Sequence, residues 1–132
     1  MARTYADSAR LREVYSTMFD EIADDESLGG LVDLQMVINF RLKDPKADIW
    51  VDGRARPVQT AFDPIGVDAT LTARLSADSM HQLLLGTLPL GKAVLFRKLK
   101  VSGAKSKAMQ LEPLLHACQA VYPRIAADSL DH

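Results

Sequence analysis

Cysteine is almost absent from this sequence of 132 residues, which contains only Cys118. A single cysteine excludes an internal disulfide and any metal site built from several cysteines. The neighbours Leu115, Ala117 and Val121 are apolar, and no adjoining basic residue is present to lower the pKa of the thiol. We therefore expect Cys118 to pack as a small buried hydrophobic residue, with a reactive thiol as the less favoured alternative.

Long apolar runs are also missing. No run approaches the length of a transmembrane helix, and the N-terminal segment MARTYADSARLREVY lacks the apolar stretch of a secretory signal. The net charge of −1 and the pI near 6.3 give no overall attraction for nucleic acid. With 48% apolar and 25% charged residues, the composition is that of a globular domain rather than of a disordered chain. We expect a soluble, cytoplasmic protein that does not bind nucleic acid.

Motifs for catalysis and metal binding are absent as well. No serine lies in a Gly-x-Ser-x-Gly motif, and the acidic cluster at residues 24–26 lacks the spacing of a calcium loop. Serines near the expected helix starts are explained as caps: Ser76, Ser79, Ser102 and Ser106. The histidines have no metal-ligand spacing: His81, His116 and His132. The sequence therefore gives no reason to expect an enzyme, a cofactor or a metal.

The length favours one domain that is large enough for a core and a separate ligand cavity. We expect an N-terminal helix and linker over residues 1–30, a core over 31–122 and a flexible tail over 123–132. Within the first segment, apolar residues recur at helical spacing between Asp7 and Ala23, and Asp7 is the candidate N-cap.

Strict alternation of apolar and polar residues predicts a strand over residues 32–42. One buried face and one wet face favour an antiparallel sheet with its helices on one side. Pro57 lacks a ladder N–H, so the strand that contains it should start there or lie at an edge. Turn sequences, including a tight Asp52-Gly53 hairpin, separate the further expected strands, which cover residues 47–51, 55–62, 67–75 and 98–102.

Residues 76–107 contain more apolar side chains than one small helix can bury. Ser76 should cap a helix that ends at Gly86, and Pro89 should start a shorter one that reaches Phe96. The last helix should begin at Gly103, with a kink at Pro113. Because no acid, histidine or cysteine lies among the apolar residues from 83 to 96, we interpret this stretch as a wall for an apolar ligand.

Three segments in this order resemble the sterol carrier protein 2 (SCP2) lipid-transfer domain, in its standalone bacterial type, from about Leu31 to Tyr122. They are INFRLKDPKADIWVDGRARPV, DATLTARLSADSMHQLLLGTLPLGKAVLF and RKLKVSGAKSKAMQL. The resemblance implies an α+β fold in which helices cover one face of a five-stranded, mostly antiparallel sheet. It also implies an apolar tunnel that holds a fatty acid, an acyl-CoA or a sterol-like lipid without covalent chemistry.

The candidate tunnel lining combines large apolar residues of the two short helices, the sheet and the last helix. It consists of Phe40, Trp50, Phe62, Leu71, Met80, Leu84, Leu88, Leu90, Val94, Phe96, Leu111 and Leu115. Ordinary core packing is the alternative for each residue. Trp50 shares a strand face with Asp48 and Asp52, which predicts an exposed or cavity-capping indole, although it could equally cover a second helix or a dimer partner.

Basic residues gather around the fifth expected strand: Lys92, Arg97, Lys98, Lys100, Lys105 and Lys107. They are candidates for contact with anionic head groups or a CoA phosphate, and a solvated strand face is the alternative. The predicted function is non-covalent lipid binding and transfer with transient membrane contact. A scaffold or oligomerisation module, including a homodimer that buries the same apolar surface, is the alternative. An enzyme that uses Trp50 with the Asp48 and Asp52 pair is a weaker third.

Overall fold

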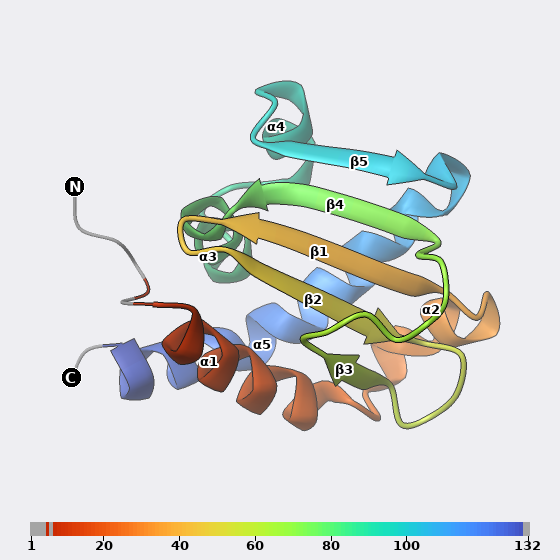
Figure 1. Cartoon of the computed structure of the whole chain (residues 1–132), viewed down its shortest axis with the longest axis horizontal. Coiled ribbons are helices and arrows are strands. Elements are labelled where there is room, and N and C mark those ends of the chain that lie inside the picture. Colours follow the sequence, from red (N-terminus) through yellow and green to blue (C-terminus); the bar gives the residue numbers. More distant parts are fainter. Residues whose placement is uncertain (1–4, 6, 131–132) are drawn as a thin grey trace.

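A mixed five-stranded sheet with strand order β3-β2-β1-β4-β5 forms the centre of the molecule. The computed structural model describes residue 5 and residues 7–130 (Figure 1). The strands are β1 (Val37–Lys43), β2 (Ala47–Asp52), β3 (Gln59–Ala61), β4 (Leu71–Ser76) and β5 (Leu99–Gly103). The α-helices are α1 (Ser8–Ile22), α2 (Gly29–Asp33), α3 (Ala77–Leu85), α4 (Leu90–Leu95) and α5 (Leu111–Leu130), with 3₁₀ turns at Glu26–Leu28 and Lys105–Gln110.

The core lies between one face of the sheet and the helices. Alternate residues of β2 and β4 are buried, as in Ile49 and Ala73, because successive strand side chains point to opposite faces, whereas the first four residues of the central strand β1 are all buried. In Figure 1, α5 runs behind the sheet, and α1 and α3 pack against α5. The predicted α+β class with helices on one face of a five-stranded sheet is therefore correct.

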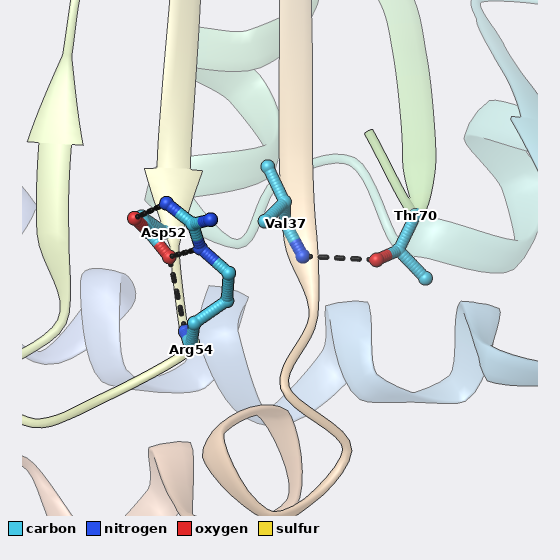
Figure 2. A network of polar contacts seen from close by, with 4 residues as sticks. All are labelled: Val37, Asp52, Arg54 and Thr70. Atoms are coloured by element: carbon cyan, nitrogen blue, oxygen red, sulfur yellow. Dashed lines mark hydrogen bonds and ion pairs between the residues drawn. The ribbon is translucent and has the colours of Figure 1, made fainter. Parts of the chain in front are cut away.

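The sheet is mostly antiparallel, as predicted, but β1 and β4 are parallel neighbours. The chain leaves the edge strand β3 and returns to the end of the sheet where β1 begins. There Thr70 N donates to Val37 O at 2.6 Å, and Val37 N donates to Thr70 Oγ1 at 3.0 Å (Figure 2). The sequence indicated successive strands, and this crossover has no local signal.

Two predicted strands begin too early in the sequence. Residues 32 and 33, which we expected to start the first strand, belong to α2, because Leu28 and Leu31 are both buried at helical spacing. Gln35 then has φ 49° in the left-handed region, which ends the helical turn ahead of Val37. Since β1 starts at Val37, residues 67–69 have no strand neighbour, and β4 begins at Leu71 rather than Val67.

The third strand is shorter than predicted and is an edge strand, as Pro57 indicated. Asp52 pairs with Gln59, so a longer loop replaces the expected tight hairpin at Asp52-Gly53. Val58 N donates to Ala23 O at 3.0 Å and is therefore not available to the sheet.

Local sequence signals predicted the ends of α3 and α4 to within about one residue. Ser76 accepts a hydrogen bond from Ser79 N, and Gly86 closes α3 in the left-handed conformation at φ 81°. Pro89 is the N-cap of α4 rather than its first residue.

The C-terminal helix differs from the prediction in two ways. It starts at Leu111 after a 3₁₀ turn, so Pro113 lies in its first turn, where a backbone N–H is not needed, and not in the helix interior, where a proline would cause the expected kink. It also continues through Leu130, with Ile125 and Ala126 buried, where we expected a flexible tail over residues 123–132. Residues 131 and 132 of that expected tail lie outside the described residues.

Candidate functional site

A small apolar void lies between the sheet and the helices, and its volume is about 10 Å³. Nine apolar residues line it: Phe40, Ala73, Leu75, Met80, Leu83, Leu90, Leu99, Leu111 and Leu115. They come from three strands and three helices, so the site exists only in the folded chain. A volume of this size holds roughly one water molecule and is far too small for an acyl chain.

The structure brings five of the twelve predicted tunnel residues together around this void: Phe40, Met80, Leu90, Leu111 and Leu115. Leu71, Leu84 and Leu88 are buried elsewhere in the core, and Phe62 packs against it half-buried. Sequence reasoning did not select Ala73, Leu75, Leu83 and Leu99. The same alternation that predicted the strands would have placed Ala73, Leu75 and Leu99 on the inward face.

Val94 and Phe96 face solvent instead of lining the void. Their exposed fractions are 50% and 61%, and Leu95 between them is 73% exposed. Leu90 and Ala93 alone among the residues of α4 pack into or against the core. In Figure 1, α4 lies at the edge of the sheet next to β5, apart from the other helices. This helix therefore presents an apolar surface to the outside.

Trp50 lies on the sheet face opposite the void and is half-buried. Its Nε1 is inaccessible to solvent and has no hydrogen-bond partner. Beside it, the buried Asn39 donates to Asp48 Oδ1 at 2.5 Å and to Ile49 O at 3.1 Å. Asp52 holds Arg54 through both carboxylate oxygens (Figure 2), and these hydrogen bonds lower the pKa of Asp52. Both carboxylates near the indole are thus already hydrogen-bonded.

An open groove of about 970 Å³ lies at the end of the sheet where β1 and β4 finish. Its lining contains seven basic residues, which are Arg41, Lys43, Lys46, Arg74, Arg97, Lys98 and Lys100. Asp7 and Asp44 are the acids of this lining, and Ser76 and Ser79 from the start of α3 add hydroxyl groups. The groove is therefore strongly cationic.

Sequence reasoning identified Arg97, Lys98 and Lys100 as a basic cluster, and the structure places all three in the groove. Lys92, Lys105 and Lys107 do not line it. The remaining basic residues of the groove were missed: Arg41, Lys43, Lys46 and Arg74. Alternation places Arg41 and Arg74 on wet strand faces, but no local pattern shows that their strands are neighbours.

A buried polar cluster joins the start of the chain to α1, α3 and α5. The Tyr5 hydroxyl is hydrogen-bonded to those of Tyr15, at 3.0 Å, and Tyr122. His81 Nδ1 lies 2.5 Å from the Tyr122 hydroxyl. Burial raises the pKa of all three tyrosines, and it lowers the pKa of His81 against the opposing effect of Asp78. No local sequence pattern predicts this cluster, because its members are far apart in the chain.

Cys118 is buried in α5 and free, as the sequence predicted, and burial raises the pKa of its thiol. Across residues 5 and 7–130, no three His, Cys, Asp or Glu side chains are grouped in a way that would hold a metal ion. No helix in the described part of the chain combines the length and apolar character needed to cross a membrane.

Comparison with known proteins connects this fold to lipid carriers. The family model described as the SCP-2 sterol transfer family matches residues 17–116. The solution structure of the sterol carrier protein domain 2 of Helicoverpa armigera has a TM-score of 0.67 at 16% identity, over 84% of this chain and 89% of that one. The search of curated proteins gave no match.

Two further solved structures share the fold. The solution structure of palmitated SCP2L2 from Aedes aegypti has a TM-score of 0.64 at 16% identity, covering 80% of this chain and 94% of that one. The apo form of sterol carrier protein 2 from Yarrowia lipolytica has a TM-score of 0.55 at 19% identity, covering 86% and 90%.

Proposed function

The chain belongs to the SCP-2 sterol transfer family, and on this premise we propose that it binds a lipid non-covalently between the sheet and helices α3 and α4. The apolar void is the observation that supports this proposal. All nine of its lining residues are apolar, so a hydrocarbon chain entering there would leave no polar group of the lining without a partner. The Aedes aegypti structure is that of a palmitated protein, which supports an acyl chain as the ligand.

Ligand entry requires the void to widen, and α4 is the element best suited to move. Leu90 at the start of α4 lines the void, and Ala93 is the one residue of this helix that is fully buried. An element with little buried apolar surface opens at a low free-energy cost. We expect α4 to swing outward with Leu90, so that the space it leaves joins the void and admits the chain.

Binding of cis-parinaric acid, a fluorescent fatty acid, tests this proposal. Ala73→Leu places extra volume in the void and should weaken binding about tenfold or more, because the larger side chain occupies space that the probe needs. Leu90→Ala enlarges the void and should strengthen binding, so it keeps the test informative if the first variant fails to fold. Leu85→Ala, on an exposed position of α3, is the matched control and should bind like the wild type. Wild-type protein that binds no probe and carries no lipid in native mass spectrometry would contradict the proposal.

We further propose that α4 contacts an anionic membrane when lipid is exchanged. Its exposed apolar residues Val94, Leu95 and Phe96 are flanked in sequence by the exposed Lys92, Arg97 and Lys98. Apolar residues beside basic ones suit the boundary between acyl chains and anionic head groups, where each Lys or Arg contributes about 1 kcal/mol. Charge complementarity therefore favours a lipid surface over a neutral protein surface.

Co-sedimentation with vesicles tests the membrane contact. The protein should bind vesicles of phosphatidylcholine mixed with phosphatidylserine more tightly than pure phosphatidylcholine, and salt should weaken the binding. The double variant Leu95→Ser, Phe96→Ser should lose this binding without loss of stability. Met109→Ser is the matched control, because Met109 is 79% exposed but lies outside α4. A wild-type dimer in sedimentation equilibrium that the double variant dissociates, without vesicle binding, would support the scaffold function instead.

A further inference from the structure

Three cationic residues stand side by side across three adjacent strands of the sheet. Arg41 on β1 is the register partner of Arg74 on β4, which is in turn the register partner of Lys100 on β5. Register partners point to the same face, and like charges at such positions destabilise a sheet. This cationic row, Arg41-Arg74-Lys100, therefore costs stability in the free protein.

No acid within the described residues forms an ion pair with the cationic row. Ion pairs elsewhere in this part of the chain join Arg10 to Glu13, Arg54 to Asp52 and Arg124 to Glu21. Asp48 is the register partner of Arg41 on β2 and is, among the described residues, the one carboxylate beside the row; it accepts a hydrogen bond from Asn39 and forms no ion pair with Arg41. Arg74 Nη1 donates to the neutral Ser102 Oγ at 3.3 Å. The three cations of the row therefore outnumber the one carboxylate beside them, and the row keeps a net positive charge.

Further cations complete a concave site around the row. Lys43 lies at the end of β1, and Lys46 lies in the β1–β2 connection, which is held to α1 because Ser8 Oγ donates to Lys46 O at 2.7 Å. Arg97 and Lys98 approach from the segment between α4 and β5, and Arg97 has a left-handed φ of 58°. Figure 1 shows β1 and β4 ending at the same side of the sheet, so these groups converge on one groove.

We propose that this groove binds the phosphate groups of a phosphorylated ligand, with Arg41 and Arg74 as the principal contacts. The guanidinium group of an arginine side chain can bind two phosphate oxygens at once. The groove contains seven basic residues, more than a ligand with a single carboxylate would neutralise, which favours a ligand with the higher negative charge of phosphate groups. The volume of about 970 Å³ is that of a small-molecule site. The same phosphate chemistry is offered by a free phosphorylated coenzyme and by a phospholipid head group.

Leu75 lines both the groove and the apolar void, so the two spaces meet at this residue. A ligand with a phosphate at one end and a hydrocarbon chain at the other would place its head in the groove and pass its chain along Leu75. This second step rests on the proposed lipid-binding function. Phosphate binding in the groove does not depend on it.

Calorimetric titration of the full chain with inorganic pyrophosphate tests the groove alone. The double variant Arg41→Gln, Arg74→Gln should lower the affinity for pyrophosphate at least tenfold, and its unfolding temperature should stay equal or rise because repulsion is removed. The matched control, Lys105→Gln with Lys107→Gln, changes the same charge outside the groove and should bind like the wild type. Absence of pyrophosphate binding at millimolar concentration, or equal binding by both double variants, would overturn the proposal.

Two further ligands identify the source of the phosphate. Dihexanoyl phosphatidic acid that binds more tightly than pyrophosphate indicates a lipid head group, and equal or weaker binding indicates a free phosphorylated compound. A single-stranded oligonucleotide that binds more tightly than both would assign the groove to nucleic acid and overturn the proposal.

Binding of the neutral apolar probe Nile red separates the hypothesis of phosphate binding in the groove from that of lipid binding in the void. If Nile red fails to bind and pyrophosphate binds, the proposed lipid site is wrong and the proposed phosphate site is supported. If Nile red binds and pyrophosphate does not, only the proposed phosphate site is wrong.

Discussion

Nδ1 of His81 lies 2.5 Å from the phenolic oxygen of Tyr122, and this hydrogen bond joins α3 to α5. Tyr122 is also hydrogen-bonded to Tyr5, and through Tyr5 to Tyr15 on α1. Partial burial lowers the pKa of His81, and the nearby Asp78 opposes that shift without reversing it. The neutral imidazole is therefore the form that the folded state favours.

The lowered pKa of His81 predicts a loss of stability in weak acid. The unfolded chain takes up a proton near pH 6.5, and the folded chain takes it up only at lower pH. The free energy of unfolding should thus have its highest value above about pH 6.5. It should fall as the pH drops from about 6.5 to the pKa of His81 in the folded state. Urea titrations between about pH 8 and pH 5 measure this slope.

His81→Gln should flatten that slope, and His116→Gln, at an exposed position, should leave it unchanged. Hydrogen bonds from Ser27 and Arg54 lower the pKa of Asp25 and Asp52, so the stability linked to these carboxylates is lost only in more acidic solution. A slope that persists in His81→Gln would contradict the assignment to this histidine.

Tyr122→Phe should destabilise the fold more than Tyr15→Phe does. Removing the Tyr122 hydroxyl takes a hydrogen-bond partner from both His81 and Tyr5, whereas the Tyr15 hydroxyl has one partner, Tyr5. A buried polar group left without a partner costs about 1–3 kcal/mol. Urea unfolding at neutral pH measures the loss in the free energy of unfolding for both variants. Equal losses in the two variants would show that the contact between α3 and α5 adds nothing to stability.

Gly103→Ala should be among the most harmful glycine substitutions in the chain. Gly103 has a φ of 102°, and a Cβ added there would lie 2.4 Å from Thr70 O, a backbone atom that cannot easily move. Gly66→Ala is the matched control for the backbone conformation alone, because its φ of 82° is also positive but nothing lies within 4 Å. Thermal unfolding should show a loss of about 1–2 kcal/mol at Gly66 and more at Gly103. Similar losses at both positions would mean that β5 can shift away from Thr70.

The sequence predicted those features of the fold that depend on nearby residues. Ser76 and Gly86 bound α3 through their own backbone preferences, and alternation along β1 placed Phe40 inward and Arg41 outward. The pairing of β1 with β4 depends instead on a crossover of the chain at Thr70. For that reason the apolar lining of the void could be predicted in part from the sequence, and so could three basic residues of the groove, whereas the position of Arg41 beside Arg74 could not.

The size of the void shows a second limit of sequence reasoning. Apolar residues at the right spacing predict which side chains face inward, but how closely they meet depends on packing of the whole core. Phe40 and Leu111 both reach the void, yet the space between the lining residues is about 10 Å³ rather than an open tunnel. The proposed lipid site therefore requires α4 to move.

Cys118 should react with thiol reagents only when the protein opens. The side chain is 1% exposed in α5, and burial raises the pKa of its thiol, so the reactive thiolate is scarce in the folded state. Labelling by Ellman's reagent near pH 8 should be slower than in urea-unfolded protein by a factor of about a thousand or more. Ala120→Cys adds an exposed thiol two residues further along the same helix and serves as the control, because it should give one fast and one slow reaction. Rapid labelling of Cys118 in the wild type would mean that α5 separates from the core far more readily than its buried residues imply.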